Sequence, residues 1–156
     1  TTTEESLQHA LIEYERISAI TYDIGVFITA TDIFRKVEWI DQAIETLEAD
    51  QDLESVFVGT RTHKNFWSKN EDGSFKRLQP WMANYSSRQI RKPVYREDTG
   101  LACASRASLW RVGRRIGDKV AIIENDDEFS FIDIHTEQDL NLAEAALKIR
   151  RLYGEH

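Results

Sequence analysis

Apolar and polar positions change along this chain in blocks that are typical of a sheet covered by helices. A short apolar run from Ile24 to Ile28 has the character of a strand that is buried on both faces. A polar turn, 29–32, follows, and apolar residues then recur every three or four positions from Val37 to Leu47, as on one face of a helix. The stretch 22–47 therefore predicts a buried strand, a loop and an amphipathic helix, which together form half of a βαβ unit.

The same patterns predict elements on both sides of this unit. Thr2 and Glu5 have the spacing of a capping box at the start of a helix, and Thr136 has the character of a cap for a final helix. Buried strands are expected at 54–59 and 120–123, and shorter ones at 94–96 and 101–104. The α-β-α-β order of the first 60 residues predicts an α/β fold, with a Rossmann-like, mainly parallel sheet and flanking helices. A chain of 156 residues is expected to form a single domain, 1–156.

The loop 29–35 is the first candidate for a functional site. In open α/β sheets, ligands bind outside the carboxyl ends of the strands, and this loop follows the first predicted strand. The alternative is an ordinary connection from strand to helix, in which Thr31 or Asp32 only caps the helix.

The region 62–92 has a different character from the rest of the chain. Its aromatic residues follow no helical period and surround Asn70-Glu-Asp-Gly73, a sequence that is typical of a hairpin turn. We predict a β-hairpin arm whose aromatic side chains, Phe66, Trp67 and Trp81 among them, pack on a second subunit and form a homodimer. The alternative is that they pack on the sheet of their own chain.

Composition narrows the classes of function. The net charge of −7 is unevenly distributed, because residues 1–60 hold 13 acidic and 3 basic side chains, whereas residues 61–96 hold 2 acidic and 9 basic ones. A basic middle in an acidic protein favours a small anionic substrate or an acidic partner surface and argues against nucleic acid. No apolar run is long enough to cross a membrane. Cys103 is the only cysteine, which excludes an internal disulfide and predicts a cytoplasmic location.

One pair of residues has the spacing of a metal site. The seven glycines build neither a dinucleotide-binding fingerprint nor a P-loop, and the sequence contains no pair of closely spaced cysteines. Asp133 and His135 precede the last predicted helix, and side chains two residues apart in an extended segment project to the same face. The two side chains can therefore reach one ion, although such a pair taken alone is weak evidence.

Four stretches, in this order, resemble the acylneuraminate (CMP-sialic acid) cytidylyltransferases. The segment 131–136, Phe-Ile-Asp-Ile-His-Thr, with Asp139-Leu140 after it, resembles the family's Ile-Asp-Ile-Asp-Thr motif and the helix that follows. The loop Thr-Ala-Thr-Asp-Ile-Phe-Arg at 29–35 is similar to Gln-Pro-Thr-Ser-Pro-Leu-Arg. Arg88-Gln89 matches an Arg-Gln pair, and the segment from Tyr95 to Gly100 is similar to Tyr-x-Glu-Asn-Gly.

The resemblance implies a fold of the nucleotide-diphospho-sugar transferase type and a reaction. Such enzymes couple CTP to an anionic 2-keto-3-deoxy sugar acid, such as sialic acid, and release pyrophosphate with the help of Mg²⁺. Asp133 and Arg88 would be the catalytic residues, Asp133 as a metal ligand and Arg88 through contact with the anionic sugar acid, and the arm 62–92 would be the family's dimerisation arm. The substrate-binding positions implied are Thr29, Thr31, Arg35, Gln89, Tyr95, Gly100 and Cys103.

Several positions depart from the family's pattern. Thr29 stands where the family has Gln, one residue is inserted before Gly100, and Cys103 replaces an expected tyrosine. These differences point to a related 2-keto acid or another nucleotide-activated sugar rather than sialic acid itself. His135 replaces the second aspartate of the metal site, and because imidazole suits Mn²⁺ better than Mg²⁺, Mn²⁺ is an alternative cofactor.

Two further expectations concern the chain as a whole. The family's glycine-, arginine- and lysine-rich loop, which cradles the triphosphate, has no counterpart between residues 1 and 56. We therefore expect an N-terminally incomplete domain that by itself binds CTP poorly and is inactive, while the complete protein is the enzyme. The rival hypothesis is a non-catalytic dimerisation or regulatory module that kept the fold and lost the chemistry.

Overall fold

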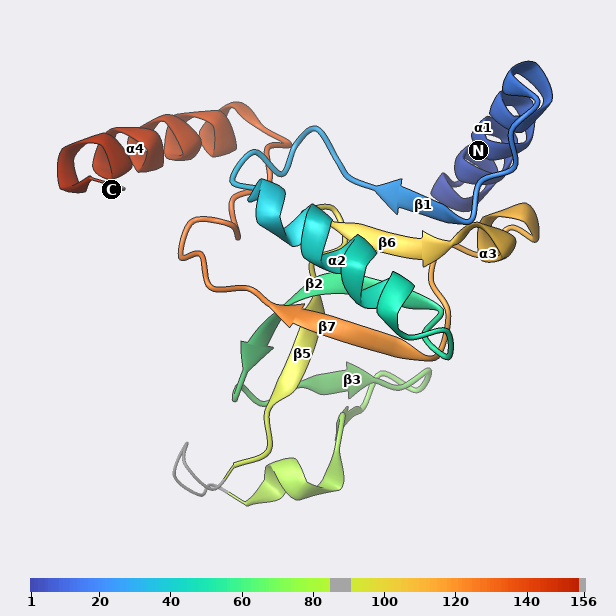
Figure 1. Cartoon of the computed structure of the whole chain (residues 1–156). Helices are drawn as coiled ribbons and strands as arrows, with labels where there is room; N and C mark the ends of the chain where they lie inside the picture. The colour runs from blue at the N-terminus through green and yellow to red at the C-terminus, as the bar shows by residue number, and fades with distance from the viewer. Residues whose placement is uncertain (85–90, 155–156) are drawn as a thin grey trace.

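The computed structural model describes residues 1–84 and 91–154. Figure 1 shows their arrangement. The elements are, in chain order, α1 (Thr3–Ser18), β1 (Ile24–Phe27), α2 (Val37–Ala49), β2 (Ser55–Thr62), β3 (Trp67–Lys69), β4 (Phe75–Arg77), the 3₁₀ helix η1 (Pro80–Ala83), β5 (Val94–Glu97), β6 (Cys103–Arg106), α3 (Ala107–Arg111), β7 (Val120–Glu124) and α4 (Glu137–Tyr153). No helix in these two ranges is long and apolar enough to span a membrane.

Strand β2 is the centre of the main sheet. Strand β7 pairs with it in parallel along one edge, from Ser55 opposite Val120 to Gly59 opposite Glu124. Along the other edge, β6 pairs with the first half of β2 and β5 with the second half, both antiparallel. Strand β1 completes the sheet by pairing antiparallel with β6.

The predicted α/β class is confirmed, and the directions of the strands refine it. The pairings place β1, β2 and β7 in one direction, as expected for strands that are joined by helical crossovers. Strands β5 and β6 run in the opposite direction. The chain leaves the end of β2, passes through the arm, and then runs back beside β2 as β5 and β6. Both strands are therefore antiparallel to β2, as in a hairpin.

Helix α2 covers one face of the sheet, and the core lies between them (Figure 1). Trp39, Ala43 and Leu47 of α2 are buried against Val56 and Val58 of β2, together with residues of β6 and β7. Burying a side chain such as Leu47 contributes about 1.5–3 kcal/mol to the free energy of unfolding. The predicted helix is confirmed, but its buried face is shifted, because Trp39 and Ala43 are buried whereas Val37, which the spacing placed on that face, is 67% exposed.

The outer helices pack on two smaller clusters. Leu11 of α1 is buried with Leu109 and Trp110 of α3, and the helix begins with the predicted capping box between Thr2 and Glu5. Helix α4 rests through two alanines on Phe34 and Ile132, and its own capping box joins Thr136 to Asp139. This second cap matters for function because it fixes the end of the segment that carries Asp133 and His135.

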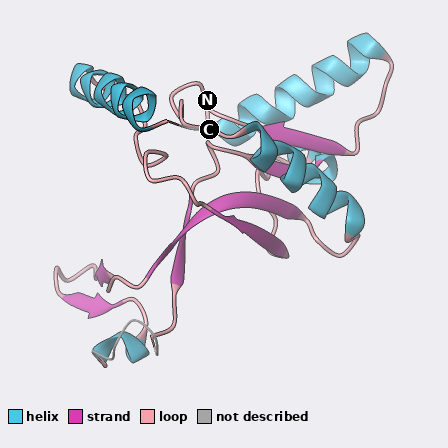
Figure 2. Ribbon diagram, turned by 60° about the vertical axis from the view of Figure 1, so that its left-hand side comes forward, coloured by secondary structure: helices cyan, strands magenta, loops and turns pink. Residues whose placement is uncertain are grey.

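The predicted hairpin is present in the arm. Strands β3 and β4 pair antiparallel from Trp67 opposite Arg77 to Lys69 opposite Phe75, and Gly73 takes a positive φ of 85° in the turn. Figure 2 shows the hairpin and η1 at the end of β2 and β5 that lies away from the helices. Trp67 and Phe75 are 51% and 65% exposed, so about half or more of each side chain is not covered by its own chain.

Candidate functional site

A short excursion between β5 and β6 forms one wall of a cleft. The amide of Asp98 donates to the carbonyl of Val58 (2.9 Å), and the amide of Val58 donates to the carbonyl of Ala102 (3.0 Å). The three residues between these two hydrogen bonds, 99–101, leave the ladder and form a turn, in which the amide of Leu101 donates to the carbonyl of Asp98 (3.0 Å). The amide of Thr29, just after β1, donates to the carbonyl of Gly100 (2.9 Å), so the excursion lies beside the carboxyl end of β1.

The cleft at this point has a volume of about 450 Å³. The loop after β1 contributes Thr29, Thr31 and Asp32, and the end of β5 with the excursion contributes residues 96–100. The segment before α4 contributes Ser130, Phe131, Asp133 and His135. Arg115, Phe27 and Thr3 complete the lining. Residues that are more than 100 positions apart in the sequence thus meet at the edge where an α/β sheet is expected to bind ligands.

Gly100 is required at its position by the space that is available there. The Thr29 hydroxyl donates to the Asp32 carboxylate, and these two groups lie directly against the Cα atom of Gly100. A Cβ atom at position 100 would overlap both the carboxylate and the hydroxyl. The absence of a side chain therefore lets the excursion close onto the loop after β1.

Arg35 joins the two loops from behind the cleft. Its guanidinium donates to the carbonyls of Leu101 (2.6 Å) and Gly100 (2.9 Å) and to that of Thr29. These three bonds occupy the side chain, which does not line the cleft. Arg35, predicted to bind substrate, is placed instead where it holds the two walls together.

Asp133 and His135 lie side by side in the segment before α4. The Nε2 atom of His135 is 2.6 Å from Oδ2 of Asp133, as expected for side chains that project to the same face. The other carboxylate oxygen of Asp133, Oδ1, is buried and has no hydrogen-bond partner among the described residues. Those residues form no group of three or more histidine, cysteine, aspartate or glutamate side chains that could hold a metal. The pair therefore offers two protein ligands at most.

Tyr95 and Cys103 lie outside the cleft, although both were expected to contact the substrate. Cys103 is fully buried in the middle of the sheet, and this burial raises the pKa of its thiol. The hydroxyl of Tyr95 donates to Glu124 (2.6 Å), and this hydrogen bond raises the pKa of Tyr95. Arg88 and Gln89 lie outside the described residues. Of the predicted site residues, those that meet in the cleft are Thr29, Thr31, Gly100, Asp133 and His135.

Sequence reasoning missed several residues of the cleft. Arg96 and Asp98 form an ion pair (Nε to Oδ1, 2.7 Å), and Asp98 also accepts a hydrogen bond from the Thr60 hydroxyl. Arg115 reaches the cleft from the connection between α3 and β7. The excess of basic residues in 97–119 is visible in the sequence, but nothing in its spacing indicates which arginine turns inward.

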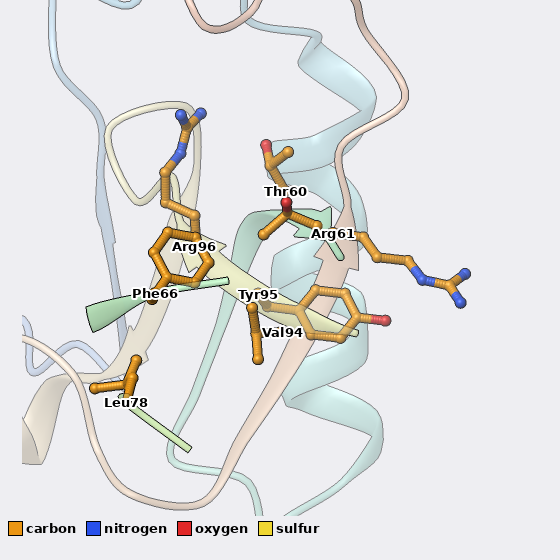
Figure 3. Close-up of a pocket in the computed structure, with 8 residues that line it drawn as sticks. Thr60, Arg61, Phe66, Leu78, Val94, Tyr95 and Arg96 are labelled. Carbon is orange, nitrogen blue, oxygen red and sulfur yellow. The ribbon is translucent and has the colours of Figure 1, made fainter. Parts of the chain in front are cut away.

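A second cavity of about 440 Å³ lies at the base of the arm. Figure 3 shows the rings of Phe66 and Tyr95 beside Val94 and Leu78, while the guanidinium groups of Arg61 and Arg96 extend away from them. The cavity is therefore mainly apolar, in contrast to the polar cleft. Arg96 lines both, so the two spaces share a wall.

Comparison with known proteins shows the fold. The chain matches no protein-family model and no curated protein sequence. Among solved structures it is similar to the crystal structure of 4-diphosphocytidyl-2C-methyl-D-erythritol synthase from Anaerococcus prevotii DSM 20548, with a TM-score of 0.57 and 18% sequence identity. The similarity covers 95% of this chain and 67% of that one. The chain thus has a nucleotidyltransferase-like α/β fold.

Proposed function

We propose that the complete protein is a nucleotidyltransferase that activates a 2-keto-3-deoxy sugar acid with CTP and releases pyrophosphate. The observation that carries this proposal is the meeting of Thr29, Thr31, Gly100, Asp133 and His135 in one cleft, since these residues belong to the separate motifs of the resemblance. The fold supports the same reaction class, because the name of the similar structure describes the synthesis of a diphosphocytidyl compound.

The protein has to supply mainly the groups that bind CTP and the sugar acid and orient them for the reaction. A hydroxyl oxygen of the sugar acid forms a bond to the α-phosphorus of CTP, the bond to pyrophosphate breaks, and the hydroxyl proton passes to solvent. Such transfers depend mainly on positioning and on stabilisation of negative charge. The hydroxyls of Thr29 and Thr31 would hydrogen-bond the sugar, and Phe131, 58% exposed at the rim, would cover its apolar face.

The side chains of Asp133 and His135 fit a divalent cation whose remaining ligands would come from the substrate. Mg²⁺ is usually held by one or two carboxylates together with substrate phosphates, so a complete cage of protein ligands is not needed. Asp133 would hold the ion through Oδ1, which lacks another partner among the described residues, and the neighbouring His135 would favour Mn²⁺. When bound, the ion would neutralise charge on the phosphates.

A pyrophosphate-release assay on the complete protein tests the proposal. The protein is incubated with CTP, Mg²⁺ or Mn²⁺, and a panel of eight- and nine-carbon 2-keto-3-deoxy sugar acids. We expect release with at least one acid and none when that acid is omitted. ATP, GTP and UTP serve as controls for the base. A folded protein that releases no pyrophosphate with any acid would contradict the proposal.

The second candidate function is a dimerisation or regulatory module without catalysis. It is favoured by the replacement of an expected aspartate by His135 and by the lack of a three-ligand metal cluster in the described ranges. The two candidates differ in CTP binding, which calorimetry measures. An enzyme must bind CTP in the complete protein, whereas a module that lost the chemistry has no need to do so.

The arm is proposed to form the two-fold interface of a homodimer. In the register of the hairpin, Trp67, Lys69, Phe75 and Arg77 share one face, and Ser68 and Lys76 share the other. Lys69 and Arg77 lie over the aromatic rings, with Cζ of Arg77 4.4 Å from the centre of the Trp67 ring. The exposed face is thus aromatic and basic, a composition typical of interface centres.

Trp67→Asp is expected to weaken this dimer by about 30-fold or more, since large aromatic anchors contribute about 2 kcal/mol or more to an interface. Sedimentation or light scattering at micromolar concentration measures the effect. Lys76→Asp is the matched control, because it places the same charged side chain on the opposite face of the hairpin. An unmodified protein that is monomeric at this concentration would refute the interface.

A further inference from the structure

Arg115 is held in the cleft by its backbone and by the packing of its guanidinium on Phe27. Its carbonyl accepts hydrogen bonds from the Ser105 hydroxyl (2.8 Å) and from the indole N–H of Trp110 (3.2 Å). Its guanidinium lies over the ring of Phe27, with Cζ 5.2 Å from the ring centre. The side chain is 26% exposed, so its direction is set by packing rather than by solvent.

The guanidinium keeps donor capacity after these contacts. Nη1 donates to the Thr99 hydroxyl (3.2 Å), and Nε lies 3.7 Å from a carboxylate oxygen of Glu4, beyond hydrogen-bond distance. Among the described residues Nε has no hydrogen-bond partner, and Nη2 donates to none of them. Nε itself is buried, so the donor capacity that a ligand in the cleft can use lies on the two Nη atoms of this oriented cation.

Arg96, the other arginine in the cleft wall, is already neutralised. Its Nε donates to Asp98 at 2.7 Å, and its side chain is 55% exposed. The remaining charged groups in the lining are mostly carboxylates, including Asp32, Glu97 and Asp133. An anionic ligand that enters this cleft needs a positive group to offset their repulsion. Arg115 is the group that the geometry makes available.

We propose that Arg115 binds the carboxylate of the substrate and selects sugar acids over neutral sugars. The planar guanidinium matches a carboxylate with two parallel hydrogen bonds, and stacking on Phe27 holds the plane in place before the ligand arrives. The inference rests on the proposed function for the class of substrate. It adds an anion-binding residue that none of the sequence motifs contains.

Calorimetric titration of the complete protein without CTP tests the assignment. The probes are N-acetylneuraminate, 3-deoxy-D-manno-octulosonate and the methyl ester of each acid. Arg115→Gln should weaken binding of the acids by about 10- to 100-fold, the loss of a charge-assisted hydrogen-bonded pair, and should leave the weaker binding of the esters unchanged. Arg114→Gln is the matched control, because Arg114 pairs with Asp118 on the surface and does not line the cleft.

Loss of binding in Arg115→Gln could also result from misfolding, so a second variant that is expected to tighten binding of the acids provides an independent test. Glu4→Gln removes the carboxylate that competes for Arg115, so it should tighten binding of the acids by about two- to fivefold. The gain should vanish in the double variant with Arg115→Gln, as a double-mutant cycle requires for two coupled residues.

Three results would overturn the inference. The first is that folded Arg115→Gln binds the acids as tightly as the unmodified protein does, and the second is that Arg96→Gln loses binding while Arg115→Gln keeps it. The third is that the unmodified protein binds neither acid. Because CTP is absent from the titration, these results are separate from a failure of nucleotide transfer. Acid binding that depends on Arg115, without pyrophosphate release, would refute the reaction and keep the binding site.

Discussion

Asp133→Asn lowers the rate of nucleotide transfer by about a hundredfold or more if the cleft holds a cation on this carboxylate. The asparagine keeps the shape of the side chain and its hydrogen bond to His135, so the fold should be unaffected. What it removes is the negative charge opposite the metal. A metal ion stabilises the transition state by several kcal/mol, and each 1.36 kcal/mol changes the rate about tenfold. Initial rates of pyrophosphate release measure the loss.

Asp126→Asn is the matched control for this prediction. Asp126 lies in the loop before α4, as Asp133 does, but its carboxylate pairs with Lys36 (3.0 Å) and lies outside the cleft. Its substitution should leave the rate within about twofold of the unmodified protein. If both variants lose activity equally, the effect belongs to the loop rather than to a metal ligand. If neither loses activity, Asp133 serves only to orient His135.

Gly100→Ala is expected to lower the free energy of unfolding by about 1–3 kcal/mol and to abolish sugar-acid binding. The added methyl group overlaps the Asp32 carboxylate and the Thr29 hydroxyl, and overpacking of this kind forces side chains or backbone to move. The movement would separate the excursion from the loop after β1, and that contact forms the cleft. Thermal unfolding should show a fall of about 2–4 °C for each kcal/mol.

A second substitution separates the steric cause from other effects of alanine at this position. Asp32→Ala in the Gly100→Ala background removes the carboxylate and frees the Thr29 hydroxyl to rotate away. Part of the lost stability should therefore return in the double variant. A single Gly100→Ala variant that melts at the same temperature as the unmodified protein and still binds the acid would show that the excursion tolerates a side chain.

The sequence predicts the elements of this fold well where one face of each is buried. The strand at 24–27, the helix from Val37, the capping box of Thr2 and Glu5 and the cap at Thr136 depend on local spacing, which periodicity and cap chemistry report directly. The directions of β5 and β6 could not be predicted in the same way. They depend on how the chain returns from the arm, and no local pattern encodes a return along the same edge of β2.

Some residues of the candidate site could also be predicted from the sequence, and others could not. Thr29, Thr31 and Gly100 could be anticipated because they adjoin the carboxyl end of a predicted strand or belong to ordered motifs. Cys103 was misplaced, since its position in a predicted strand says nothing about which side of the sheet is covered. Arg115 was missed because it enters the cleft through tertiary packing on Phe27, which lies 88 positions before it in the sequence and belongs to another element.

A crystal structure of the complete protein with a CMP-activated sugar acid tests the central claim most directly, namely that the cleft beside β1 is where the acid is held. We predict that the sugar lies between the Thr29 loop and the excursion at Gly100, with its carboxylate on Arg115 and its phosphate beside Asp133. A sugar acid bound instead in the apolar cavity at the base of the arm, with the cleft empty, would contradict the account.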